Sequence, residues 1–217
     1  GLFFDPHGPT RRKEIYEDYK AGRKPAPEEF NTQMPLIIDI SRAMGMPVFI
    51  RDGIEADDFI VSTAKKAAAE GWHVKILSAD KDLFQVIGGA IEVVRPAKGV
   101  SDFRSYDEEY FEKEFGFTPA SMADYLALLG DAVDNIPGVA GIGEKGAKEL
   151  ITAYGSLDGI YEHLDEIAKG KRAKLTAGRE QAYISKTLIV PIDTEPAPLD
   201  ELKLKEPDAP VLREMCE

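Results

Sequence analysis

The chain has 217 residues, of which 43% are hydrophobic and 30% are charged, a composition typical of a protein with a buried core. Its formal net charge of −12 argues against a uniform attraction to nucleic acid. No apolar run approaches the ~20 residues of a membrane-spanning helix, so we expect no membrane partner. The single cysteine, Cys216, excludes a disulfide within these residues and fits the reducing cytoplasm.

Charge is distributed unevenly along the chain. Residues 1–25 carry six Lys/Arg against four acids, and residues 168–186 carry six against one. Residues 193–217 carry eight acids against three bases. Solvated surface charge explains most of these residues one by one, but separate basic segments can also bind phosphates while acids elsewhere bind cations.

The first half alternates apolar runs with helical patterns. Strands are expected at residues 2–4, 47–50, 73–78 and 91–94, and helices at 10–25, 28–44 and 55–70. The helix over 10–25 has a thin apolar stripe, whereas the next one offers Met34, Leu36, Ile37, Ile40 and Met44 to the core. Gly71 is expected to end the third helix. This alternation predicts a parallel α/β sheet with a site along its carboxyl edge.

The second half is predicted to be helical. Helices are expected at residues 107–115, 119–129, 143–154, 157–164 and 178–189, with the basic run 169–174 as a solvated helix end. Aromatic residues of the stretch 103–117 are assigned to the core rather than to a base-stacking surface. Prolines between 191 and 210 predict an extended, loosely held segment, and residues 212–217 resemble the beginning of a helix.

Acids recur at the predicted strand ends, helix starts and turns. They are Asp5, Glu55, Asp57, Asp58, Asp80, Asp82, Asp131 and Asp134. A single one is best explained as a helix cap or turn residue, but the repeated pairing favours a shared site. Carboxylates that converge resist ionisation unless cations neutralise them, and all-oxygen ligands favour Mg²⁺ or Mn²⁺ over Zn²⁺. Two such ions roughly 4 Å apart can clamp a phosphodiester.

The stretch 130–147 combines one acid pair with a series of glycines. Asp131 and Asp134 are three residues apart, a spacing that would place them on one face of a helical turn. Pro137 and the glycines 138, 141 and 143 then predict tight turns before a helix resumes. Glycine lets backbone approach a phosphate, and the following helix N-terminus favours an anion.

These motifs, in this order, resemble the 5′-nuclease family, which includes flap endonucleases and the amino-terminal domain of bacterial DNA polymerase I. The matching segments are Phe4-Asp5 with Thr10-x-Arg12, Tyr16-x-x-Tyr19-Lys20-x-x-Arg23, Glu55-Ala56-Asp57-Asp58, Asp80-Lys81-Asp82, and Gly130-Asp131-x-x-Asp134-Asn135-Ile136-Pro137-Gly138-Val139-x-Gly141-Ile142-Gly143-Glu144-Lys145. The resemblance covers essentially the whole chain. It implies a PIN-like or resolvase-like α/β core, flanked by helices, with a helical subdomain of the helix–hairpin–helix type.

The resemblance also implies roles for individual residues. Asp5, Glu55, Asp57 and Asp58 would hold the first of two metal ions, and Asp80, Asp82, Asp131 and Asp134 the second. Lys20 and Arg23 would contact the scissile phosphate and act in catalysis together with Asp57, Asp58, Asp82 and Asp131. Arg12, Tyr16 and Tyr19 would contact the DNA strand. Gly138, Gly141, Gly143 and Lys145 would hold duplex DNA, with a K⁺ ion at the hairpin.

The implied substrate is DNA with a 5′ flap, a nick or a free 5′ end, cut by 5′→3′ exonuclease or flap endonuclease chemistry in replication and repair. Relatives carry another strand with a metal-binding Asp ahead of the Asp5 motif, so we expect a fragment whose metal site lacks one ligand. The full protein is expected in the bacterial cytoplasm with polymerase domains attached. The expected division is a nuclease core over 1–108, a DNA-binding subdomain over 109–195 and an acidic tail over 196–217.

Two other functions would each explain part of this pattern. A catalytically impaired, structure-specific DNA-binding module would keep the hairpin, but it would gain nothing from a cluster of mutually repelling acids. A single-strand ribonuclease on a similar acidic sheet would have no use for the hairpin of residues 130–147. The sequence therefore favours the 5′ nuclease.

Overall fold

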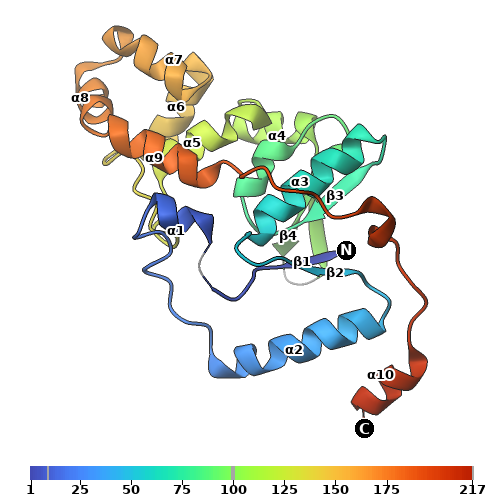
Figure 1. Ribbon diagram of the computed structural model, residues 1–217. Helices are drawn as coiled ribbons and strands as arrows, with labels where there is room; N and C mark the ends of the chain where they lie inside the picture. The colour runs from blue at the N-terminus through green and yellow to red at the C-terminus, as the bar shows by residue number, and fades with distance from the viewer. Residues whose placement is uncertain (9, 99–100, 217) are drawn as a thin grey trace.

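The computed structural model describes residues 1–8, 10–98 and 101–216 and contains two separate sheets (Figure 1). In the first, β1 (Leu2–Phe4) pairs in parallel with β2 (Val48–Ile50), with Phe3 opposite Phe49. In the second, β3 (Val74–Leu77) pairs in parallel with β4 (Ile91–Lys98), and β5 (Asp102–Tyr106) pairs with β4 antiparallel. The four predicted strands and the α/β class are confirmed. The single sheet that the pattern suggested is instead divided into two.

Strand β5 was not predicted from the sequence because it is an edge strand. Of its residues only Tyr106 is buried, so it lacks the apolar alternation that marks a half-buried strand. The other side chains of β5 are exposed. An antiparallel strand at the edge of a sheet can be solvated in this way, and it then has no apolar run by which the sequence would reveal it.

Helix α3 (Ala56–Ala69) packs against strands of both sheets, β1 from the first and β3 and β4 from the second. Its buried side includes Val61 and Ala64, as the helical pattern predicted. Against the first sheet, the ring of Phe59 meets those of Phe3 and Phe49 edge-on at 5.2 and 6.0 Å. The helix ends at Gly71, whose φ of +87° is the left-handed conformation that favours glycine.

The remaining described chain after β5 is helical. The helices are α4 (Glu108–Phe115), α5 (Met122–Leu129), α6 (Glu144–Tyr154), α7 (Leu157–Glu162), α8 (Lys169–Ala177), α9 (Arg179–Ile189) and α10 (Ala209–Cys216), with short 3₁₀ turns η2 (Pro119–Ser121), η3 (Leu164–Glu166) and η4 (Leu199–Leu202). Another 3₁₀ turn, η1 (Asp82–Val86), lies between β3 and β4. The five predicted helices are confirmed. The basic run is itself a helix, α8, because the fully buried Leu175 anchors it to the core.

The main core extends from α3, β3 and β4 into the helical part. Tyr106, Phe111 and Phe117 are buried in it, and the stacked rings of Phe111 and Phe115 lie 4.4 Å apart. The assignment of these aromatic residues to the core is therefore confirmed, except for Phe103, which is 48% exposed on the edge strand. None of the described helices has the length and apolarity needed to cross a membrane.

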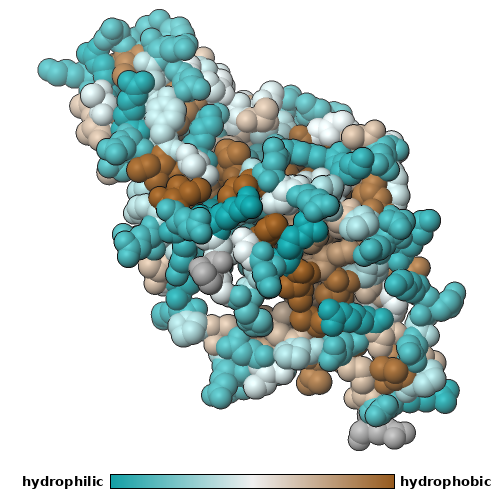
Figure 2. Space-filling view, in the orientation of Figure 1, coloured by the Kyte–Doolittle hydropathy of each residue, from teal (hydrophilic) through white to brown (hydrophobic). Residues whose placement is uncertain are grey.

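Helix α2 (Glu28–Ala43) forms where it was predicted, but of its expected core residues only Met34 is partly buried. Leu36 is 56% exposed, and Ile37, Ile40 and Met44 are also exposed. The helix stands apart from the main body and packs chiefly against β2 and α10 (Figure 1). Figure 2 shows hydrophobic side chains open on this face around β1, β2 and α2. Periodicity located the helix, but only its neighbours decide which face is buried.

Residues 190–198 are extended as predicted, but they are not loosely held. The backbone amides of Thr194 and Ala197 donate to the hydroxyls of Ser62 and Thr63 on α3, both at 3.0 Å. Ala197 is only 2% exposed. The prolines exclude a helix, while the polar stripe on α3 supplies the acceptors that an extended strand of peptide needs.

The first prediction concerns this anchoring of the 190–198 segment. Thr63→Val keeps the shape of the side chain but removes the acceptor of the buried Ala197 amide, so the free energy of unfolding should fall by about 1–3 kcal/mol. Chemical denaturation measures the change. In the control Thr187→Val, the lost hydroxyl donates only to the Tyr183 carbonyl on the exposed face of α9, so the free energy of unfolding should change by no more than about 0.5 kcal/mol. Equal losses in the two variants would contradict the role given to Thr63.

Candidate active site

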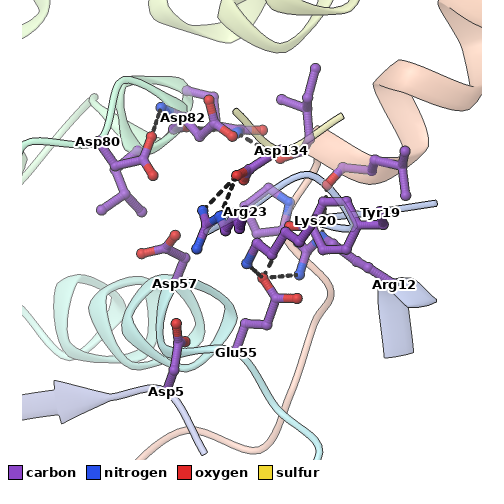
Figure 3. A pocket seen from close by; sticks show the side chains of 15 residues that line it. Asp5, Arg12, Tyr19, Lys20, Arg23, Glu55, Asp57, Asp80, Asp82 and Asp134 are labelled. Atoms are coloured by element: carbon purple, nitrogen blue, oxygen red, sulfur yellow. Dashed lines mark hydrogen bonds and ion pairs between the residues drawn. The ribbon is translucent and has the colours of Figure 1, made fainter. Parts of the chain in front are cut away.

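Six of the eight acids expected at this site line one cavity of about 200 Å³ (Figure 3). Its acidic lining consists of Asp5, Glu55, Asp57, Asp80, Asp82 and Asp134. These residues come from the ends of β1 and β3, the start of α3 and the loop after α5. The two halves of the split sheet thus bring their acids to one place because both rest on α3.

Local hydrogen bonds fix the acids at the strand ends. One oxygen of Asp5 accepts the amide of Ala56 at 2.8 Å, which ties the end of β1 to the start of α3. Asp80 accepts the amide of Asp82 at 2.9 Å, the short turn that Asp favours after a strand. Gln85 donates to the carbonyl of Ile189 at 3.1 Å and joins this turn to α9.

Asp131 and Asp134 lie in a closed loop rather than on a helical turn. Asp131 and Ile136 exchange backbone hydrogen bonds of 2.9 and 2.7 Å, and Asn135 has a φ of +57°. One Asp131 carboxylate oxygen accepts the amide of Val133 at 2.7 Å. Asp134 faces the cavity, while Asp131 lines an adjacent cavity that shares Asp80, Asp82 and Asp134 with it. The pairing is as expected, but a loop with a left-handed residue achieves it.

Two carboxyls in the cavity carry uncompensated charge. Burial, with repulsion from Asp80 and Asp5, raises the pKa of Asp57 to about 7. Burial also raises the pKa of Asp82 to about 7, with repulsion from Asp80 and Asp57 adding to it. Such shifts mean that the ionised acids need a cation which the surrounding protein does not fully supply.

Cations of the 10–25 segment also line the cavity. The Lys20 ammonium lies 2.8 Å from Glu55, and the Arg23 guanidinium lies 2.6 Å from Asp134. Burial acts to raise the pKa of Glu55, but hydrogen bonds from Lys20 and Thr10 outweigh it and lower that pKa. Figure 3 shows Arg23 between Asp134 and Asp57. The expected helix over 10–25 is reduced to α1 (Arg11–Ile15) followed by turns.

The joint between this segment and the Asp131–Ile136 loop involves two unusual backbone conformations. Lys20 has a φ of +58°, and Lys20 and Asn135 are the described non-glycine residues with positive φ. The Lys20 amide donates to the Asp134 carbonyl, and the Asn135 side chain donates to the Asp18 carbonyl, both at 2.9 Å. Left-handed backbone outside glycine is concentrated at functional sites, where surrounding contacts hold it.

The donor chemistry of the cavity fits a hard divalent cation. Every titratable donor in the acidic lining is a carboxylate oxygen, the ligand that Mg²⁺ and Mn²⁺ prefer. In the described part of the chain, no three His, Cys, Asp or Glu side chains come close enough together to enclose an ion. Lys20 and Arg23 pair with two of the acids instead.

Arg12 and Asp58 lie apart from the roles that the resemblance implied. Arg12 is 4% and Asp58 3% exposed, and they form a bidentate pair with two contacts of 2.7 Å. Arg12 thus has almost no surface to offer to a DNA strand, and Asp58 does not line the cavity. Their pairing was not visible in the sequence because 46 residues separate them.

The two tyrosines assigned to DNA are also turned inward. Tyr19 is 4% exposed and its hydroxyl lies 3.2 Å from Glu55. Burial, with the negative charge of Glu55, raises the pKa of Tyr19. Tyr16 is partly buried against the same small core as Tyr19. Both side chains hold the segment down in this structure.

The glycine hairpin is built as a compact turn before α6. Gly138 has a φ of +62°, and a Cβ there would lie 2.5 Å from the amide nitrogen of Gly130, so this position requires glycine. Gly143 caps α6, whose first turn holds the exposed Lys145. Lys174 donates to the carbonyl of Gly141 at 2.9 Å.

Sequence reasoning missed two residues that support the hairpin. The hydroxyl of Ser185, fully buried on α9, accepts the Gly138 amide at 2.9 Å. Lys174 on α8 shares a shallow cavity with Pro137, Gly138 and Gly178. The basic run 169–174 was the signal for Lys174, whereas nothing in the sequence marks Ser185.

Two family models cover nearly all of the chain. A model described as the N-terminal resolvase-like domain of 5′-3′ exonucleases matches residues 1–116, and one described as their C-terminal SAM fold matches residues 117–210. The resemblance inferred from the motifs is confirmed by both.

Curated relatives and solved structures agree with these matches. The thermostable DNA polymerase I of Thermus thermophilus is 38% identical over 216 residues, and the DNA polymerase I of Streptococcus pneumoniae is 41% identical over 210. These alignments take in 100% and 94% of this chain but only 25% and 24% of the relatives. The chain therefore spans about a quarter of their length.

Among solved structures, T5 5′-exonuclease with bound zinc is similar in fold with a TM-score of 0.70 at 23% identity, over 86% of this chain and 72% of that one. The catalytic core of Rad2 in complex with a DNA substrate has a TM-score of 0.65 at 17% identity, over 98% and 72%. With consecutive family models matched over residues 1–210 on a fold of this kind, the chain belongs to the 5′-3′ exonuclease family.

Proposed function

We propose that this chain is a metal-dependent 5′ nuclease that hydrolyses phosphodiester bonds at 5′ ends and flaps of branched or nicked duplex DNA. The observation that supports this proposal most is the cavity in which Asp57 and Asp82 have raised pKa values and which Lys20 and Arg23 also line. A site that combines excess carboxylate with exposed cations is suited to bind metal ions and a phosphate together.

The acids would hold up to two divalent ions, Mg²⁺ or Mn²⁺. Asp5, Glu55 and Asp57 would hold the first ion, and Asp80, Asp82, Asp131 and Asp134 the second. When bound, such ions activate a water molecule and stabilise the oxygen that leaves. Asp58 is left out of this ligand set because its carboxylate is taken up by Arg12.

Lys20 and Arg23 would bind the scissile phosphate. Their side chains are 21% and 45% exposed, whereas the acids that they contact are 6% and 14% exposed. They are therefore the cations of the cavity lining that a phosphate can reach from solvent, since Arg12 is buried. In this structure they neutralise Glu55 and Asp134, and divalent ions would take over that task.

The hairpin would hold the duplex beside the cavity. Gly138, Gly141 and Gly143 let backbone approach a phosphate, and exposed Lys145 stands at the start of α6. A K⁺ ion at the hairpin remains part of the proposal. Attached polymerase domains and a place in the bacterial cytoplasm are proposed from the relatives, since this chain spans 25% of the Thermus thermophilus protein.

The second prediction tests the metal ligands. Asp131→Asn and Asp134→Asn should lower Mg²⁺-dependent cleavage of a 5′-flap substrate at least roughly 100-fold, measured in the longer polypeptide that the resemblance implies. Asp193→Asn removes the same charge from a side chain that is 90% exposed and does not line the cavity, and it should leave cleavage unchanged. Flap binding should survive all three changes and weaken with salt. Unchanged cleavage in Asp131→Asn and Asp134→Asn would show that these two residues are not metal ligands.

If the protein binds flaps tightly yet never cuts them with Mg²⁺ or Mn²⁺ present, the impaired DNA-binding module is the correct function instead. The raised pKa values of Asp57 and Asp82 favour the nuclease, because a binding module gains nothing from that repulsion.

The third prediction concerns pH in the metal-free protein. Asp57 and Asp82 have pKa values of about 7 when folded and about 4 when unfolded, so between these values the folded state binds more protons. With a chelator present, the free energy of unfolding should therefore fall by roughly 1–3 kcal/mol as pH rises from 5 to 8. Asp57→Asn and Asp82→Asn should flatten this fall, and Mg²⁺ at pH 8 should restore stability to the wild type. A wild-type pH dependence retained in both variants would refute the shifts.

A further inference from the structure

The carboxylate of Asp58 is fully engaged by protein groups. One oxygen accepts from Arg12 at 2.7 Å and from the backbone amide of Ile192 at 2.9 Å, and the other oxygen accepts from Arg12 at 2.7 Å. The residue is 3% exposed and lies outside the acid-lined cavity. Its neighbour Asp57 makes none of these bonds and faces the cavity. Of the two adjacent acids, Asp58 is therefore bound by protein groups and Asp57 is open to the cavity.

The Arg12 guanidinium is equally occupied. Besides its two bonds to Asp58, its Nε donates to the carbonyl of Leu188 at 2.7 Å, and a terminal nitrogen donates to that of Val190 at 3.2 Å. These carbonyls are at the end of α9, where helical partners run out. One side chain thus joins α1, α3 and the end of α9. A planar fork with several donors is what such a three-way contact requires, and Lys cannot supply it.

Arg12 is the buried residue at the start of the 10–25 segment. Helix α1 has five residues, too few to be stable alone, and the residues around Arg12 within it are exposed. Thr10 donates to Glu55 at 2.5 Å just before the helix, and Tyr19 is buried further along the chain. Lys20 and Arg23 follow directly, so Arg12 anchors the start of the segment that carries these two cations, while Tyr19 anchors the part next to them.

We propose that Arg12 and Asp58 are a positioning pair that locks the 10–23 segment onto α3 and α9 so that Lys20 and Arg23 face the acid-lined cavity. Neither residue of the pair binds DNA or a metal ion. The role of this pair in placing Lys20 and Arg23 for catalysis rests on the nuclease proposed above. The attachment of the 10–23 segment by the pair is a property of the metal-free and DNA-free protein.

The test compares two neighbouring acids, Asp58→Asn and Asp57→Asn, in the whole chain without metal. A glutamate-specific protease is added, and mass spectrometry follows cleavage after Glu14 and Glu17, which lie in the locked segment. Asp58→Asn should speed this cleavage about 10-fold or more, because opening of the segment no longer breaks the ion pair. Asp57→Asn should leave the cleavage rate within about 2-fold of the wild type.

Mn²⁺ titration of the same proteins should give the reverse order. Asp57→Asn should weaken Mn²⁺ binding about 10-fold or more, and Asp58→Asn should leave it within about 2-fold. Proteolysis no faster in Asp58→Asn, or Mn²⁺ binding weakened there as much as in Asp57→Asn, overturns the positioning pair. Mn²⁺ binding unchanged in Asp57→Asn would instead count against the nuclease proposal, while the proteolysis result still decides the pair.

Arg12→Lys provides a second route if Asp58→Asn does not fold. Arg12 lies 3.5 Å from Glu55 as well, and lysine keeps this positive charge but cannot make the bidentate contact with Asp58. Cleavage after Glu14 and Glu17 should therefore rise while Mn²⁺ binding stays within about 2-fold. The matched control is Arg11→Lys, on the exposed side of α1, which should change neither readout. Proteolysis unchanged in Arg12→Lys, with loss of flap affinity, would show that Arg12 contacts DNA and would overturn the proposal.

Discussion

Repulsion among carboxylates is the constraint around which this structure is arranged. Acids from the ends of two sheets, the start of α3 and the loop after α5 face one cavity, and burial makes their charges harder to maintain. Asp57 and Asp82 show the consequence in pKa values of about 7. A protein keeps such a cluster only where something positive is bound in the course of its function.

The fold holds these acids with one helix as their common support. Strands of both sheets rest on α3, whose N-cap residue is Glu55 and whose first turn carries Asp57. Its polar stripe binds the 190–198 segment. Lys20 and Arg23 reach the same cavity from a segment with little regular structure of its own. The rigid side therefore supplies the acids and the less regular side supplies the cations, an arrangement that lets the cations exchange protein carboxylates for a phosphate.

Much of this could be predicted from the sequence. The strand ends at Asp5 and Asp80, the helix start at Asp57 and the glycine turn at Gly138 are marked by local signals, and the structure brings the acids together. The failures concern burial. Leu36 and Ile40 of α2 were assigned to the core and are exposed, while Ala197 was assigned to a loose segment and is buried. Periodicity describes an element, whereas burial depends on what packs against it.

The sequence by itself determined the family, the α/β class and the set of acids, because these depend on residue type and on order along the chain. The tertiary structure alone decided how the acids are used. Asp57 and Asp58 are adjacent and chemically identical, yet one points into the cavity and the other is closed off by Arg12, 46 residues away. Successive residues on a helix point about 100° apart. The partners that α1 and the chain after α9 bring to Asp58 exist only in the folded protein, and they decide that one of the two acids is paired while the other faces the cavity.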